Sequence, residues 1–239
     1  MWENIKTVIY ALLIALVLRT VLVQPFHIPS GSMLPNLLIG DYIFVSKWAY
    51  GYSKHSILFS PPVGEGRLFG KTPARGDVAV FKAPGHGRRD YIKRVIGLPG
   101  DRVQMRHGQL YINRKPVKRE ELSMGTITGP YGELRKVRRW RETLDNGTSY
   151  VTFDMINESA ADNTMEYSVP EGHVFMMGDN RDNSSDSRLE ADGFAYVPIE
   201  NMVGKAEVVM FSNTDSLTWW NPISWVMSLR GNRFFHHIP

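Results

Sequence analysis

The chain has 239 residues, of which 28 are Lys or Arg and 24 are Asp or Glu, so its formal net charge is +4. This length suits one or two domains with a buried core. The basic residues are scattered and do not alternate with aromatic residues, so nucleic acid is not an expected partner. The absence of cysteine excludes disulfides, thiolate metal sites and a cysteine nucleophile.

The N-terminal segment is the only strongly apolar part of the chain. Residues 5–23 have about the length of a helix that spans a bilayer. The uninterrupted apolar run within them, residues 8–18, also suits the core of a cleavable signal peptide. Basic residues stand on both flanks, so charge does not settle the orientation. We predict a transmembrane helix over 5–23 with a cytoplasmic tail of residues 1–4, and keep the signal peptide as the alternative.

The rest of the chain is predicted to be mainly β, because short runs of β-branched and aromatic residues are bounded by turn residues. His107-Gly108 predicts a tight hairpin turn. The more polar residues 102–170 are predicted to be an inserted smaller β-rich domain. This domain is predicted to divide one catalytic β core into two parts, residues 24–101 and 171–213. Residues 214–239 are predicted to be a C-terminal membrane-proximal segment. The predicted strands are 41–46, 77–82, 109–113, 147–155, 173–177 and 203–211.

Two features predict that the folded part of the chain lies at a membrane surface. Ser32, the candidate nucleophile, follows the apolar segment by about nine residues, and a linker of that length reaches only ~30 Å. Residues 217–230 hold three of the six Trp residues, including Trp219 and Trp220. Indole at this density suits a bilayer interface, with core packing as the alternative. Membrane lipid is therefore an expected partner.

A base that could activate Ser32 is harder to find. The seven histidines are dispersed, and the chain has neither a Gly-x-Ser-x-Gly nor a Ser-x-x-Lys motif. A buried lysine with a lowered pKa can serve instead, and Lys93 has apolar neighbours on both sides. Strand alternation would point Lys93 and Arg94 to opposite faces, so that one can be buried while the other is solvated. The pattern alone also fits a solvated strand end.

Four segments, in this order, resemble the type I signal peptidases, which are membrane-bound serine proteases that cut signal peptides from exported precursors. The third and fourth segments are long and specific, and the set covers most of the chain. The segments are Pro29-Ser-Gly-Ser-Met33 with Gly40-Asp41, Arg75-Gly-Asp77, Lys93-Arg-Val-Ile-Gly-Leu-Pro-Gly-Asp101, and Gly178-Asp-Asn-Arg-Asp-Asn-Ser-Ser-Asp-Ser-Arg188.

The resemblance implies a role for each matching residue. Ser32 would be the nucleophile and Lys93 its general base, a dyad that needs no histidine. The Ser30 hydroxyl and the Ser32 backbone N–H would form the oxyanion hole. Ser184 would hydrogen-bond and orient the lysine. The supporting ion pair behind the site would be Asp186 with Arg188, and shallow pockets for small substrate residues would be built by Phe26, Ile28, Met33, Leu37, Tyr91 and Ile92.

The chain departs from the family pattern at Asn36, where the family usually carries Thr or Ala. Asn can still fill a turn, so the change concerns local hydrogen bonding more than activity. Arg75-Gly76-Asp77 is predicted to be a turn before a strand.

No metal or organic cofactor is expected. The spacing of polar residues over 182–186 is similar to the start of a calcium loop, but the sixth position is Ser187 rather than Gly. His236 and His237 lack carboxylate or cysteine support, so we predict a solvated tail there.

The resemblance implies an endopeptidase that removes N-terminal signal peptides from exported precursor proteins through an acyl-enzyme. It would be a single-pass protein of the bacterial cytoplasmic (inner) membrane, with its catalytic domain on the extracytoplasmic side. Its partners would be precursor proteins, membrane lipid and, by proximity, the protein export machinery. A mitochondrial inner-membrane relative is the alternative location.

Two other functions compete with this interpretation. A self-cleaving repressor-type protease also uses Ser and Lys, but that class is soluble and carries a DNA-binding domain that this sequence does not show. An exported β-rich binding protein whose signal peptide ends near Ser32 is the rival from a different class. N-terminal sequencing of the mature protein separates the second rival from an anchored enzyme.

Overall fold

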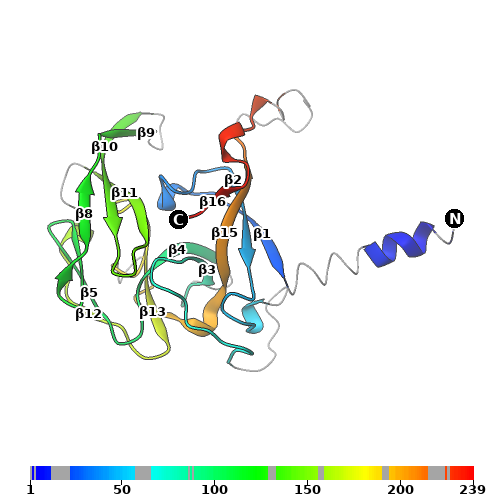
Figure 1. The fold of residues 1–239 in the computed structure, drawn as a ribbon, viewed down its shortest axis with the longest axis horizontal. Coiled ribbons are helices and arrows are strands. Elements are labelled where there is room, and N and C mark those ends of the chain that lie inside the picture. The colour runs from blue at the N-terminus through cyan, green and yellow to red at the C-terminus, as the bar shows by residue number, and fades with distance from the viewer. Residues whose placement is uncertain are drawn as a thin grey trace.

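The structure is a computed structural model that describes residues 2, 4–11, 22–56, 66–85, 87, 89–128, 133–155, 159–189, 194–214, 224 and 227–239. It is mainly β, as the sequence predicts (Figure 1). The strands are β1 (Val23–His27), β2 (Asp41–Ser46), β3 (Val78–Lys82), β4 (Asp90–Gly97), β5 (Arg102–Arg106), β6 (Gln109–Ile112), β7 (Lys115–Pro116), β8 (Lys118–Glu121), β9 (Gly125–Thr128), β10 (Leu134–Thr143), β11 (Ser149–Met155), β12 (Tyr167–Ser168), β13 (His173–Met177), β14 (Val197–Pro198), β15 (Met202–Ser212) and β16 (His236–His237). Short 3-10 turns are η1 (Gly31–Met33), η2 (Lys54–Ser56), η3 (Ala160–Asp162), η4 (Ile199–Asn201) and η5 (Gly231–Arg233).

The largest sheet contains eight strands in the order β1-β2-β15-β3-β4-β13-β14, and β16 also pairs with β15. The predicted strands at 41–46, 77–82, 173–177 and 203–211 match β2, β3, β13 and β15 within one residue at each end. His236 and His237, predicted to be a solvated tail, form β16 and are exposed. β4, which carries Lys93, lies inside this sheet between β3 and β13.

Both faces of this sheet are buried around β3. Val78 and Val80 pack in one hydrophobic cluster with side chains from β2 and β15. Ala79 and Phe81 pack in a second cluster with side chains from β4 and β13. The two faces of a strand alternate along the chain, so the continuous apolar run of β3 reflects burial on both sides.

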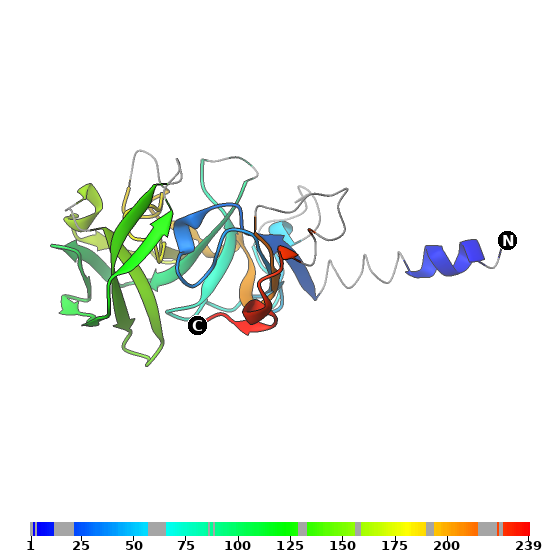
Figure 2. The same ribbon diagram turned by 90° about the horizontal axis from the view of Figure 1, so that it is seen from above.

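Residues 102–168 form two smaller sheets, β12-β5-β6-β7 and β11-β10-β8, with β9 paired to β10. Figures 1 and 2 both show these strands beside the largest sheet, and a third hydrophobic cluster joins side chains of β5 and β6 to side chains of β4 and β13. The hairpin turn predicted at His107-Gly108 is present, with φ of +47° and +71°. The turn predicted at 75–77 is also present, and Gly76 has a φ of +95°.

The predicted membrane segments lie largely outside this description. Residues 4–11 are helical, residues 12–21 of the predicted span lie outside the described residues, and residue 23 already belongs to β1. Across the described parts of the chain, no helix is both long and apolar enough to span a bilayer. Trp219 and Trp220 also lie outside the described residues.

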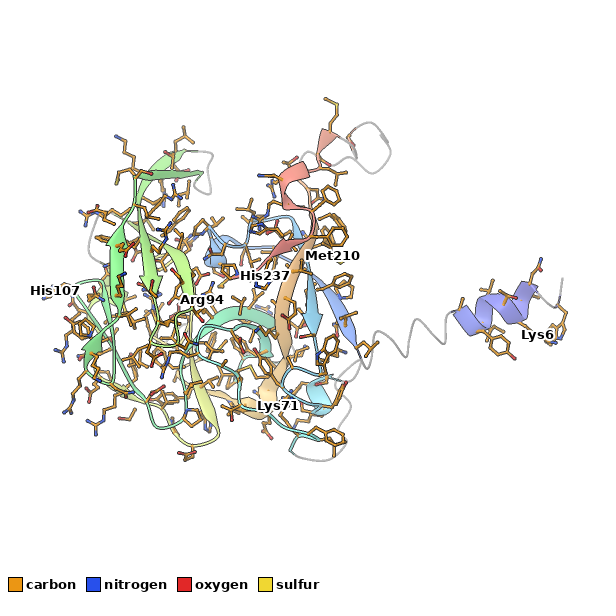
Figure 3. The ribbon with its side chains drawn as sticks, viewed as in Figure 1. Lys6, Lys71, Arg94, His107, Met210 and His237 are labelled. Atoms are coloured by element: carbon orange, nitrogen blue, oxygen red, sulfur yellow. The ribbon has the colours of Figure 1, made fainter. Side chains whose placement is uncertain are left out.

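Arg94 corrects a prediction made from strand alternation. Lys93 and Arg94 are both buried, at 4% and 0% exposure, where alternation allowed one of them to be solvated. The Arg94 guanidinium donates to both carboxylate oxygens of Asp179, at 2.8 and 2.7 Å, and lies 4.0 Å from the ring centre of Tyr150 on β11. Arg94 lies in the interior of the molecule (Figure 3), because the inserted strands cover this face of β4.

A second buried ion pair lies near Arg94. Arg181 donates through its two terminal nitrogens to the two carboxylate oxygens of Glu142 on β10, at 2.7 and 2.5 Å, and both side chains are fully enclosed. The Tyr150 hydroxyl donates to the same carboxylate at 3.0 Å. The strands of residues 102–168 are thus joined to the 178–188 loop by charge.

Glu142→Gln should destabilise the protein by about 3–5 kcal/mol, because it leaves the buried Arg181 charge without its counterion. Urea unfolding followed by circular dichroism measures this loss. The matched control is Glu120→Gln, which breaks an exposed ion pair with Lys118 and should leave the unfolding midpoint unchanged. Equal midpoints for the two variants would contradict a structural role for the buried pair.

Candidate active site

Ser32 lies in the tight turn η1, between the edge strand β1 and β2. Ser30 has extended backbone (φ −135°, ψ 156°) before the turn, and the Leu34 N–H donates to the Gly31 carbonyl at 3.2 Å. Met33 is fully buried in a hydrophobic cluster, and Ser32, which is 8% exposed, lines a cavity. A small turn anchored by an apolar side chain therefore presents a nearly buried serine.

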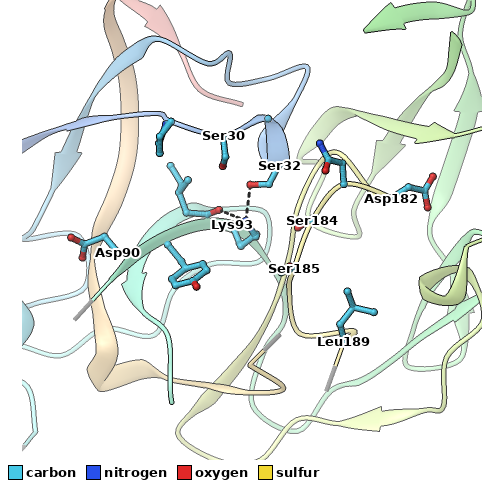
Figure 4. Close-up of a pocket in the computed structure, with 13 residues that line it drawn as sticks. Ser30, Ser32, Asp90, Lys93, Asp182, Ser184, Ser185 and Leu189 are labelled. Atoms are coloured by element: carbon cyan, nitrogen blue, oxygen red, sulfur yellow. Dashed lines mark hydrogen bonds between the residues drawn. The ribbon is translucent and has the colours of Figure 1, made fainter. Parts of the chain in front are cut away.

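Lys93 approaches Ser32 from the neighbouring β4. Its Nζ is 2.7 Å from Ser32 Oγ and 3.1 Å from the Ile92 carbonyl oxygen (Figure 4). Burial lowers the pKa of Lys93 to about 8, against the opposing charges of Asp186 and Asp179. A substantial fraction of the amine is therefore neutral near physiological pH and able to accept a proton.

The 178–188 loop packs behind this pair. The Asn180 backbone N–H donates to the Ser32 carbonyl at 3.1 Å. Asp186 and Arg188 form a buried ion pair, in which two guanidinium nitrogens lie 2.9 Å from the carboxylate oxygens. Burial alone would raise the pKa of Asp186, but the charge and hydrogen bonds of Arg188, with the Gly178 N–H, lower it. Asp186 thus remains ionised close to Lys93.

Ser184 does not occupy its predicted hydrogen-bonding position. Its Oγ makes no hydrogen bond of ordinary geometry to any described residue, Lys93 included, although its polar interaction with Asp186 helps to lower the pKa of that carboxyl. A Cβ added at Gly178 would lie 2.2 Å from Ser184 Oγ and 2.6 Å from the Ser32 carbonyl oxygen. Gly178 therefore lets the loop approach Ser32, a role that its place in the motif did not reveal.

A cavity of about 450 Å³ opens beside the dyad. Tyr91 and Ile92, predicted to bind substrate, line it, and Ser30 lines it as predicted for the oxyanion hole. The other predicted binding residues belong to the hydrophobic cluster that also contains Val78 and Val80. Half-buried Phe26 packs against this cluster, and its fully buried members include Ile28, Met33 and Leu37. These three face inward because the turn and β1 deliver their apolar side chains to the core.

Asn36 is a second residue whose contacts the sequence did not indicate. Its Nδ2 donates to Asp179 Oδ2 at 2.6 Å and to the Val151 carbonyl at 2.7 Å. Both acceptors lie more than a hundred residues away along the chain. The sequence suggested only that Asn36 can fill a turn, and this does not predict hydrogen bonds to residues so far along the chain.

Three carboxylates gather where β11 and η3 meet the 178–188 loop, with their oxygen atoms within 4.8 Å of one another: Asp154, Asp162 and Asp182. Arg119 donates to Asp154 at 2.6 Å, so a guanidinium already offsets part of the negative charge. We assign no metal ion to this cluster. Of the residues rejected as a calcium loop, Asp186 forms an ion pair with Arg188.

Comparison with known proteins decides the family. The family model described as "Signal peptidase, peptidase S26" matches residues 1–211. The chain belongs to this family. It is therefore a serine peptidase, a hydrolase, as its sequence motifs predict.

Two similar proteins from Rickettsia support the same assignment. The signal peptidase I of Rickettsia typhi is 40% identical over 248 residues, which cover 96% of this chain and 90% of that protein. The signal peptidase I of Rickettsia canadensis is 39% identical over 252 residues, covering 98% and 92% of the two chains. A crystal structure of a signal peptidase I from Enterococcus faecalis matches 56% of this chain and 97% of that chain, with 28% identity and a TM-score of 0.32.

Lys93→Met should stabilise the protein at pH 7. The folded-state pKa of about 8 lies below that of an unfolded lysine, so between the two values the unfolded chain binds a proton that the folded protein does not, and stability rises with pH. The shift corresponds to about 3 kcal/mol at pH 7. Met has similar length and no charge, so the variant should resist urea better at pH 7, and the difference should shrink by pH 10.

The control is Lys115→Met, which removes an exposed lysine of β7 and should change the unfolding free energy little at either pH. If the difference in unfolding free energy between Lys93→Met and the wild type were the same at pH 7 and pH 10, the pKa of Lys93 would not be lowered by folding.

Proposed function

We propose that this peptidase removes signal peptides from exported precursor proteins by means of a dyad formed by Ser32 and Lys93. The observation that carries the proposal is the 2.7 Å contact between Ser32 Oγ and the buried Lys93 Nζ. A serine hydroxyl is a weak nucleophile unless a base accepts its proton. The neutral Lys93 amine is the base in contact with it.

The reaction proceeds in two halves. Ser32 Oγ attacks the scissile carbonyl carbon while Lys93 accepts the hydroxyl proton, and the carbonyl oxygen takes the negative charge of the tetrahedral intermediate. Lys93 then gives the proton to the leaving amine, the C–N bond breaks, and an acyl-enzyme ester remains on Ser32. Water attacks this ester, Lys93 accepts a proton from the water, and the proton returns to Ser32 Oγ as the new carboxyl end leaves.

The Ser32 backbone N–H and the Ser30 hydroxyl are the donors that we assign to the oxyanion. Both residues line the cavity that contains the dyad. Such donors are effective when they are fixed before the charge develops. The short η1 turn and the hydrogen bond from Asn180 to the Ser32 carbonyl supply that rigidity.

The substrate would lie along the cavity between β4 and the η1 turn. Tyr91 and Ile92 give this cavity an apolar wall close to the dyad. An apolar wall favours apolar substrate side chains beside the scissile bond. The resemblance to the type I signal peptidases implies that these side chains are small, so cleavage after a small-x-small sequence is expected.

We also propose that the enzyme works at the extracytoplasmic face of a bacterial cytoplasmic membrane, close to lipid and the export machinery. The support is the apolar sequence of residues 5–23 and the short linker that follows it. Precursors are expected to present their cleavage sites at that surface.

Purified wild-type protein should cut a secretory precursor at one position after a small-x-small sequence, and mass spectrometry of both products locates the cut. Ser32→Ala and Lys93→Ala should each lower kcat by at least about 10³-fold, because each removes a reacting group. The exposed Lys115→Ala is the matched control and should cleave at the wild-type rate. Cleavage by Lys93→Ala at the rate of this control would exclude the dyad and reopen the search for a histidine base.

A further inference from the structure

Ser32 lies in a turn over residues 31–36, the nucleophile turn, and Asn36 at its end donates to two acceptors in other parts of the fold. Its side-chain amide donates one N–H to Asp179 Oδ2 at 2.6 Å and the other to the Val151 carbonyl at 2.7 Å. Val151 belongs to β11, in the middle of its pairing with β10. One side chain thus links the turn to the inserted domain and to the loop that begins at Gly178.

The Asp179 carboxylate is itself firmly positioned. It is 1% exposed and receives two hydrogen bonds from Arg94, at 2.8 and 2.7 Å. Its backbone carbonyl accepts the Phe153 N–H of β11 at 2.9 Å. An acceptor held in this way by charge and backbone can orient the amide that donates to it.

Two consecutive residues of the 178–188 loop, Asp179 and Asn180, bind the two ends of the nucleophile turn. Asn180 donates from its backbone N–H to the Ser32 carbonyl at 3.1 Å and from Nδ2 to the Gly31 carbonyl at 2.9 Å. Asp179 holds the far end through Asn36. The Asn36 backbone carbonyl also accepts a hydrogen bond of 3.0 Å from Arg233. Arg233 in turn forms an ion pair with Asp41 at the start of β2.

Asp179 also reaches the other member of the dyad. Arg94 follows Lys93 directly on β4, and the Asp179 carboxylate that accepts from Arg94 through both oxygens also accepts from Asn36 through Oδ2. Ser32 and Lys93 belong to different elements, and their 2.7 Å separation depends on how the turn is placed against β4. A single buried carboxylate therefore fixes both elements.

We propose that Asn36 is a positioning residue, which sets the Ser32 hydroxyl against Lys93 by tying the nucleophile turn to Asp179 and to strand β11 of the inserted domain. This inference rests on the proposed function, since it assigns Asn36 a part in the work of the dyad. Asn36 lines no part of the cavity beside the dyad, so its effect should fall on the chemical step rather than on substrate binding.

Asn36→Asp tests the inference with almost no change of shape. It replaces two N–H donors with a carboxylate that faces the Asp179 carboxylate and the Val151 carbonyl. A displacement of about 1 Å at a reacting group costs on the order of 10²-fold in rate, so kcat should fall by about that factor while KM stays within about twofold. Asn36→Thr keeps one hydroxyl donor, and its kcat should lie between those of Asn36→Asp and the wild type.

The matched control is Asn201→Asp in η4, which removes a single hydrogen bond of 2.9 Å to the Lys82 carbonyl. It should leave kcat and KM unchanged. Hydrogen exchange of the peptide covering residues 31–37, compared with a β15 peptide, measures the position of the turn without any substrate. Exchange at 31–37 should quicken in Asn36→Asp and not in the control.

The outcomes distinguish a failure of the proposed peptidase function from a failure of the positioning role of Asn36. If the wild type cuts no precursor, the proposed function fails, and the exchange rates still decide whether Asn36 holds the turn. Wild-type kcat and wild-type exchange at 31–37 in Asn36→Asp would overturn the inference. The inference would also be overturned if the loss of activity in Asn36→Asp only matched the unfolded fraction of that variant, measured by circular dichroism. If Asn36→Asp does not fold, the same comparison is made on Asn36→Thr, and a wild-type kcat there would overturn it.

Discussion

A lysine amine held out of water against a serine hydroxyl is the interaction on which the rest of the site depends. An ammonium ion loses hydration when it is buried, and this loss favours the neutral form. Here burial wins over the charges of Asp186 and Asp179, but those charges limit the shift, so the pKa of Lys93 settles at about 8. A base with a pKa near the working pH combines a useful neutral fraction with enough proton affinity to act.

Holding that amine in place requires buried polar structure, which a purely apolar core does not supply. Arg94 with Asp179, Asp186 with Arg188 and Glu142 with Arg181 are all enclosed charge pairs around the dyad. Such pairs contribute little net stability, because desolvation offsets their attraction. They do fix direction and register, and we infer that this is their use here. Strands β10 and β11, which supply Glu142 and the Tyr150 ring against Arg94, are thereby part of the support of the site.

The sequence predicted those features whose signal is local. β2 and β13 have the bounds that their alternation and flanking turn residues indicated. The prediction that Ser32 and Lys93 work together came from motif resemblance, and the structure places their side chains in contact. Local pattern could not show the burial of Arg94, because alternation tells which face a side chain takes but not whether another sheet covers that face. The hydrogen bonds of Asn36 could not be predicted for the same reason, since its acceptors are brought near only by the complete fold.

The most direct test is to titrate Lys93 itself. Protein labelled with carbon-13 at the lysine side chains is followed by NMR from pH 6 to pH 11, and the Lys93 signal is assigned by its absence in Lys93→Met. The midpoint of the Lys93 signal should lie at about 8. A midpoint near the ordinary lysine value of 10.5 would mean that the amine is protonated at working pH and does not serve as the base.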